Sequence, residues 1–90
     1  MKKAFQLGQL VVTTNALNTL DNQDMYEGIC RHKRCDWGEL CDEDRALNDE
    51  ALQSGEGRLM SVYHDRRGIK FWIITEADRS VTTILLPEDY

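Results

Sequence analysis

The sequence has no apolar run that approaches the roughly 18 residues needed to span a membrane as a helix. Its opening stretch, MKKAFQLGQL, contains two lysines but neither the apolar region nor the small-residue cleavage site of a signal peptide. With a single proline and six glycines in 90 residues, it also lacks the composition of a low-complexity chain. We therefore expect an ordinary globular protein of the cytoplasm that makes no contact with a membrane.

Cysteine is scarce, and its count of three is odd. A secreted domain this small would be expected to hold an even number of cysteines in disulfides, so we expect reduced thiols. Cys30, Cys35 and Cys41 lie close to His32 in the sequence, and thiols with an imidazole are the ligand types of tetrahedral zinc. However, there is no Cys-x-x-Cys pair, and His32 is only two positions from Cys30, where helical side chains diverge. We predict no metal and no other cofactor.

Basic residues are outnumbered, with 11 Lys and Arg against 16 Asp and Glu and a net charge of −5. Nucleic-acid binding depends on a basic patch for the phosphates, so this balance counts against nucleic acid as a partner. The acidity is densest over residues 36–50, which hold seven acidic side chains and one arginine. Two interpretations stay open, a solvated helix face or a docking surface for a basic partner protein.

The sequence does contain three consecutive strand-like segments over residues 58–86, RLMSVYH, IKFWIIT and SVTTILL, joined by the turn sequences DRRG and EADR. In the middle segment Phe71 and Ile73 alternate with Trp72 and Ile74, so both faces carry bulky apolar groups. This pattern predicts a central strand whose second face is covered by the N-terminal segment, the C-terminal tail or a second subunit.

The preceding half of the chain is predicted to be mainly helical. Residues 10–13 are rich in β-branched side chains and predict a strand, with a short helix after it. Residues 21–33 predict a helix with acidic residues at its start and basic residues at its end. Asp36 and Glu39 have the spacing of a capping box, which predicts a third helix from there to about residue 53.

Together these segments predict one α+β domain over residues 1–90. It has an N-terminal strand, two to three helices within about 14–54, and a three-stranded antiparallel meander over about 58–86, in a three- to four-stranded sheet. This order of elements resembles that of RelE- and barnase-like ribonuclease toxins, which is an analogy of topology only. Those enzymes are typically basic, whereas this chain is acidic.

Polar residues gather at the second predicted turn of the meander. The candidate catalytic residues for a metal-independent, ribonuclease-like enzyme are Glu76, Asp78, Arg79 and Ser80. The basic side chains at or near the first turn belong to His64, Arg66, Arg67 and Lys70. A carboxylate base, an imidazole acid and a cation are the groups that such chemistry needs. The alternative interpretation is conformational, because residues such as aspartate and serine are common in turns for backbone reasons.

Two polar residues interrupt the apolar faces of the predicted helices. His32 shares a face with Met25 and Ile29, and Asp44 lies at the centre of the next helix's apolar face, beside Asn48. If these helices pack together, His32 and Asp44 pair, as a structural bridge or as the base and orienting acid of a catalytic site. We interpret the pair as structural, since buried polar groups usually satisfy one another. Our candidate binding residues are His32, Asp36, Trp37, Asp44, Asn48, Trp72, Arg79 and Thr82.

Several stretches resemble those of a known family: FQLGQLV near the start, RHxxxDWGEL in the middle (with x any residue), Glu43 and Asp44 followed by Asn48, and ITEADRSVTTILLPEDY at the end. The family consists of small bacterial proteins of about this length that are carried on plasmids and integrative elements. The resemblance covers nearly the whole chain and implies an accessory protein of a mobile element in the bacterial cytoplasm. It implies no established activity.

The function that we expect is that of a non-enzymatic protein-interaction module. It would act through the acidic helix and the apolar second face of the sheet, on a protein partner or as a homodimer. The ribonuclease-like enzyme is the alternative, and a component or antagonist of a restriction system is a third reading that rests on the mobile-element resemblance alone. The partner or substrate, any catalytic activity and the oligomeric state stay open.

Overall fold

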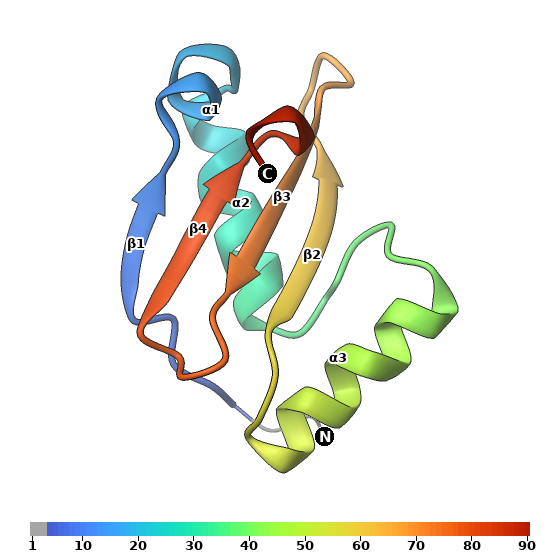
Figure 1. Ribbon diagram of the computed structural model, residues 1–90. Helices are drawn as coiled ribbons and strands as arrows, with labels where there is room; N and C mark the ends of the chain where they lie inside the picture. The colour runs from blue at the N-terminus through green and yellow to red at the C-terminus, as the bar shows by residue number, and fades with distance from the viewer. Residues whose placement is uncertain (1–3) are drawn as a thin grey trace.

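Residues 4–90, which this computed structural model describes, form a four-stranded sheet with helices on both sides (Figure 1). The strands are β1 (Gln9–Val12), β2 (Leu59–His64), β3 (Lys70–Thr75) and β4 (Val81–Leu85), in the order β1-β4-β3-β2. β3 pairs antiparallel with both β2 and β4, whereas β1 runs parallel to β4. The predicted α+β class and the predicted antiparallel meander are confirmed.

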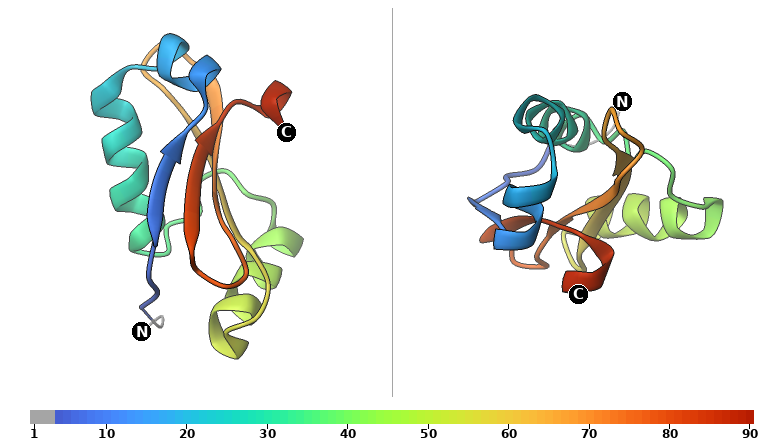
Figure 2. Two further views of the ribbon diagram at one scale, coloured as in Figure 1. Left: turned by 60° about the vertical axis from the view of Figure 1, so that its left-hand side comes forward. Right: turned by 90° about the horizontal axis from the view of Figure 1, so that it is seen from above.

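The helical elements are α1 (Thr14–Thr19), α2 (Asn22–Lys33), α3 (Asp42–Ser54) and a C-terminal 3-10 turn, η1 (Pro87–Asp89). Asp21 caps α2, because its carboxylate accepts a hydrogen bond from the backbone N–H of Gln23 at 2.9 Å. Figure 2 shows α2 along one face of the sheet, with α3 and η1 on the opposite side. None of the helices in residues 4–90 is long and apolar enough to cross a membrane.

The third helix begins later than the capping box predicts, so that prediction is wrong. α3 starts at Asp42, and residues 36–41, which we call the edge loop, run beside the outer edge of β2. The Val62 N–H donates to the Trp37 carbonyl at 3.1 Å, and the Glu39 N–H donates to the Val62 carbonyl at 2.8 Å. The reason is the indole of Trp37, which is 0% exposed, because burying so large a side chain outweighs a single helix cap.

Apolar side chains fill the space between α2 and the sheet. The buried members of this core are Ala16, Leu20, Met25, Tyr63, Phe71, Ile73, Ile84 and Leu86. α2 can approach the sheet because residue 28 is glycine, where an added Cβ would lie 3.0 Å from Cε2 of Phe71. Each large apolar side chain buried here contributes about 1.5–3 kcal/mol, so this layer supplies much of the folding free energy.

The second face of the sheet is covered by other parts of the same chain. Ile74 is only 4% exposed and shares a groove with residues of α3. Trp72 is half-buried and packs edge-on against Tyr90, with the two ring centroids 5.7 Å apart. Of the three covers that the sequence left open, the C-terminal tail lies over Trp72, and α3 covers the neighbouring position.

Candidate functional site

His32 lies at the centre of a buried chain of hydrogen bonds. Its side chain is 0% exposed, with Nδ1 2.5 Å from the Ser61 hydroxyl and Nε2 2.9 Å from the Thr75 hydroxyl. The Thr75 hydroxyl lies 2.8 Å from that of Thr82, which donates to the Leu7 carbonyl at 2.6 Å. The chain therefore joins α2 to three strands and to the segment that precedes β1.

The carbonyl at one end of this chain sets the direction of each bond between Leu7 and His32. A carbonyl only accepts, so Thr82 uses its one proton on Leu7 and must accept from Thr75. Thr75 then accepts from Nε2–H of His32. Burial lowers the pKa of His32 from 6.5 to about 4, so the imidazole is neutral near pH 7 and Nδ1 accepts from the Ser61 hydroxyl. With every proton committed, the chain has a structural role.

The predicted pairing of His32 with Asp44 is wrong, because the two residues lie on opposite sides of the sheet. Both ring nitrogens of His32 bind hydroxyl groups beneath α2, whereas Asp44 is exposed on α3. Figure 2 shows these two helices on opposite sides of the sheet. The edge loop carries the chain past β2 from one side to the other. Two helices that are consecutive in the sequence are thus separated by the sheet.

Asp36 and Trp37 hold the edge loop in place. The carboxylate of Asp36 pairs with the guanidinium of Arg31 at 2.8 Å, and this bond lowers the pKa of Asp36. The indole N–H of Trp37 donates to Asp49 at 3.3 Å, and its ring packs edge-on against His32 with centroids 5.6 Å apart. These two candidate binding residues therefore position the loop and close the core.

The candidate catalytic residues at the β3–β4 turn are engaged in holding that turn. Arg79 donates to the carbonyl of Gly57 at 2.7 Å and to that of Ala51 at 3.2 Å, near the end of α3. The carboxylate of Asp78 accepts from the hydroxyl of Ser80 at 2.6 Å and from its backbone N–H at 3.0 Å, which lowers the pKa of Asp78. A carboxylate stabilised in this way is a weaker base, and the cation is occupied by carbonyls.

The remaining members of the ribonuclease-like set lie at opposite ends of the sheet. Glu76 follows β3 at one end, whereas His64 ends β2 at the other. His64 contacts Glu39 of the edge loop, and Arg66 binds Asp24 of α2 at 3.0 Å. His64 and Arg66 are therefore separated from Glu76 by about the length of β3.

The three cysteines differ in their surroundings. Cys35 is buried, Cys30 is half-buried and Cys41 is exposed, and none of them is in a disulfide. In the part of the chain that the structure describes, no group of three His, Cys, Asp or Glu side chains could hold a metal ion.

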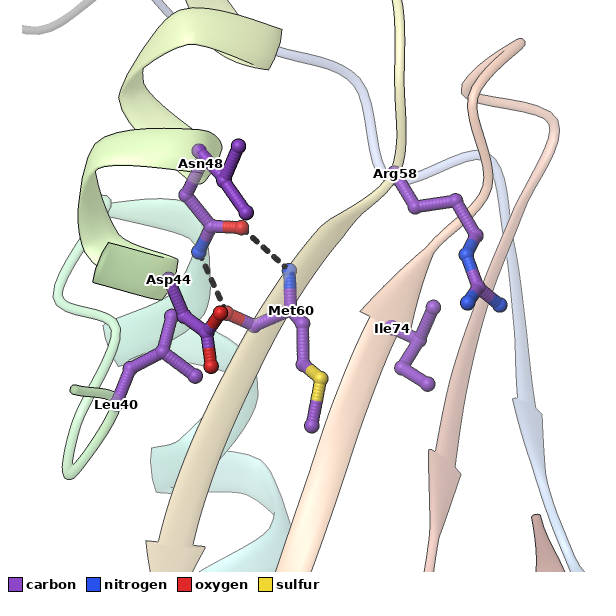
Figure 3. A pocket seen from close by; sticks show the side chains of 7 residues that line it. Leu40, Asp44, Asn48, Arg58, Met60 and Ile74 are labelled. Atoms are coloured by element: carbon purple, nitrogen blue, oxygen red, sulfur yellow. Dashed lines mark hydrogen bonds between the residues drawn. The ribbon is translucent and has the colours of Figure 1, made fainter. Parts of the chain in front are cut away.

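A groove lies between α3 and the second face of the sheet (Figure 3). This α3 groove has a volume of about 230 Å³ and is lined by Leu40, Asp44, Leu47, Asn48, Arg58, Met60 and Ile74. The Asn48 amide donates to the Met60 carbonyl at 2.6 Å and accepts from the Met60 N–H at 3.1 Å. Leu47 is 62% exposed and lies beside the other apolar side chains that line the groove, those of Leu40, Met60 and Ile74.

The helix α3, whose Asp44 lines the groove, is acidic along its length. The carboxylates of α3 belong to Asp42, Glu43, Asp44, Asp49 and Glu50. The one basic residue of this helix, Arg45, donates to the Leu40 carbonyl at 2.9 Å and also contacts the Gly38 carbonyl. Across the groove, Arg58 donates to the Tyr90 hydroxyl at 2.5 Å and stacks over its ring at 5.5 Å. Both arginines are thus engaged within the chain.

The sequence predicts only part of this groove. Asp44 and Asn48 stand out as polar residues in an apolar helix pattern, and both line it. Leu47, Arg58 and Met60 carry no such signal, since they come together only when α3 folds back onto β2.

Comparison of the chain with protein-family models, with curated proteins and with solved structures finds no match. The function is therefore inferred from the geometry and charge of the α3 groove.

Proposed function

We propose that the protein is a non-enzymatic interaction module that binds a basic, amphipathic helical segment of a partner protein in the α3 groove. The observation that carries this proposal is Leu47, which is 62% exposed beside the apolar side chains of Leu40, Met60 and Ile74. An open leucine next to an apolar floor suits recognition of a helix by its apolar face.

The size of the groove favours a side chain over a small molecule. Its volume of about 230 Å³ is below the roughly 300–1,000 Å³ of typical small-molecule sites. Interfaces often depend on one large apolar anchor that fills such a pocket. The two hydrogen bonds between Asn48 and Met60 hold the walls before binding, so little ordering of the groove is required.

The charge around the groove favours a basic partner. Asp44 lines the groove, Asp42, Glu43 and Glu50 lie elsewhere on α3, and the one arginine of the helix is turned back toward the edge loop. Lysine or arginine residues on the partner helix, flanking its apolar stripe, would lie opposite these carboxylates. Binding of this kind weakens as salt is added, because exposed charges are screened within about 10 Å at 0.1 M salt. On the strength of the family resemblance, we assign the module to a plasmid or integrative element.

Calorimetric titration with model peptides tests the proposal. The probe is a helical peptide of leucine and lysine with a continuous apolar stripe, and a peptide of the same composition in shuffled order controls for charge alone. We expect the striped peptide to bind the wild-type protein, and Leu47→Lys to weaken binding by about tenfold or more. Leu17→Lys is the matched control, since Leu17 is 55% exposed on α1 and the added charge is identical.

Three results would overturn the proposal. The striped peptide fails to bind the wild-type protein, the shuffled peptide binds as tightly as the striped one, or Leu47→Lys and Leu17→Lys have the same effect. Replacing lysine by glutamate in the striped peptide is expected to abolish binding, and retained binding would contradict the charge argument.

A further inference from the structure

The two edge strands of the sheet, β2 and β1, differ in whether their outward peptide groups are paired within the chain. At the β2 edge, the outward peptide groups of Met60 and Val62 are all paired within the chain. Asn48 binds both polar groups of Met60, at 2.6 Å and 3.1 Å. Trp37 and Glu39 bind those of Val62, at 3.1 Å and 2.8 Å. The peptide groups of Met60 and Val62 are therefore not available to another strand, and covering an edge in this way commonly prevents unwanted pairing.

The opposite edge is open. In β1, Gln9 donates to Ser80 at 2.9 Å, and Thr13, which follows β1, donates to Ile84 at 3.0 Å, so these residues face β4. Peptide groups alternate along a strand, and those of Leu10 and Val12 therefore point away from the sheet. Among residues 4–90, no helix or strand lies along this side of β1 (Figure 1).

This open edge also lacks charge. Residues 4–20 contain no Asp, Glu, Lys or Arg, although 30% of the whole chain is charged. Leu10 is 51% exposed and Val11 is 39% exposed. Free edge strands are normally protected by shortness, charged residues, proline or a covering element, and the four-residue β1 has only the first of these within Gln9–Val12.

We propose that β1 is the homodimer interface of this protein, where a second copy of the chain adds its own β1 antiparallel to form a continuous sheet. A second copy is favoured as the occupant because each chain carries a net charge of −5, and an uncharged surface is where two such chains meet with least repulsion. The same residues serve both chains in a two-fold interface, and β1 is short, apolar and self-complementary.

The register follows from pairing both outward residues of each β1, because only a two-fold axis beside Val11 places Leu10 and Val12 of one copy opposite those of the other. The outward N–H and C=O groups of Leu10 in one copy pair with those of Val12 in the other, and those of Val12 pair with those of Leu10. The two-fold axis therefore passes beside Val11. The two Val11 residues then form a pair without hydrogen bonds, in which the Cα atoms lie about 4.5 Å apart. Gln9 lies opposite Thr13 of the other copy, well away from its own counterpart.

Sedimentation velocity of the purified, reduced protein tests the interface. We expect the wild-type protein to be a dimer, and Val11→Lys to raise its dissociation constant about tenfold or more, since like charges would stand opposite each other. Val11→Thr, which keeps a β-branched side chain, and Leu47→Lys, which places the same charge in the α3 groove, should leave the dimer intact. A monomeric wild-type protein, or an unaffected dimer in Val11→Lys, would overturn the proposal.

A cross-linking experiment tests the register and does not depend on a destabilising change. In a Cys41→Ser background, which removes the exposed native thiol, Val11→Cys should form an intermolecular disulfide with oxidised glutathione. The Cα separation of about 4.5 Å falls within the range of disulfides. Gln9→Cys, two residues away on the same face, should not cross-link. Equal cross-linking of both variants, or none in Val11→Cys, would overturn the two-fold arrangement.

Discussion

The side-chain amide of Asn48 and the backbone of Met60 are joined by two reciprocal hydrogen bonds, of 2.6 Å and 3.1 Å. An asparagine side chain carries a donor and an acceptor at the spacing of a peptide group, so here it replaces a neighbouring strand. One pair of bonds thus fastens α3 to the sheet, forms a wall of the α3 groove and closes the β2 edge. The β2 edge is thus closed, whereas the β1 edge stays open. The α3 groove is the surface that we propose for partner binding, and the open β1 edge is the surface that we propose for self-association.

Replacing Asn48 with alanine is expected to destabilise the fold by about 2 kcal/mol, because both polar groups of Met60 lose their partner in a largely buried site. Urea unfolding measures the change, with Asn18→Ala as the control on exposed α1. We also expect Asn48→Ala to weaken peptide binding in the groove. A loss of stability no larger than that of Asn18→Ala would contradict this account.

Acidification is expected to destabilise the protein through His32. The pKa of His32 is about 4 in the folded protein and near 6.5 when unfolded, so the unfolded chain binds the proton first. The stability that the protein owes to an uncharged His32 is fully present above pH 6.5. It is lost as the pH falls toward 4, which lowers the free energy of unfolding by up to about 3 kcal/mol.

Comparing urea unfolding of wild type and His32→Gln over this range isolates the effect, since other groups titrate in both proteins. Glutamine keeps a donor and an acceptor but does not titrate, so the difference in unfolding free energy should shrink as the pH falls. A constant difference, or an NMR titration of the His32 ring near pH 6.5, would show that the imidazole is not held neutral by burial.

Two glycines with similar backbone angles are expected to respond very differently to alanine. Gly38 has φ +72°, and an added Cβ would lie 2.0 Å from the Val62 carbonyl oxygen, whereas Gly68 has φ +82° and open space around it. Gly38→Ala should therefore cost roughly 3 kcal/mol or more, from strain and the displaced edge loop. Gly68→Ala should cost about 1–2 kcal/mol from backbone strain alone. Thermal unfolding measures the stability of the two variants. Equal melting temperatures would contradict the close contact between the edge loop and β2 at Gly38.

Tyr90 and Tyr26 are each 69% exposed, yet only Tyr90 packs on a tryptophan. We expect Tyr90→Ala to make Trp72 more accessible to acrylamide and to lower stability by about 1 kcal/mol. Tyr26→Ala should change neither quantity. Trp37 is 0% exposed, so it contributes little to quenching in any of the variants. Identical quenching of the two variants would mean that the C-terminal tail does not cover the second face of the sheet.

Local patterns were sufficient to predict the meander. The alternation through Phe71, Trp72, Ile73 and Ile74 has the period of a strand, and the turn sequences on either side bound it, so no distant contact is needed. The start of α2 follows in the same way from Asp21, whose cap involves residues two and three positions away.

Local patterns failed at residues 36–41, where Asp36 and Glu39 match a capping box but form the edge loop. Burial of Trp37 and the backbone bonds to Val62 outweigh the cap, and those partners lie far along the sequence. The same loop decides that α2 and α3 lie on opposite sides of the sheet, which separates His32 from Asp44.

By itself, the sequence determined the class of fold, the three antiparallel strands, the acidity of the third helix and the absence of charge over residues 4–20. Only the tertiary structure decided which polar groups meet: His32 with Ser61 and Thr75, and Asn48 with Met60. It also decided which edge of the sheet stays open. The physical reason is that periodicity, caps and turns act over a few residues, whereas burial and hydrogen-bond satisfaction are settled between segments that meet only in the folded chain.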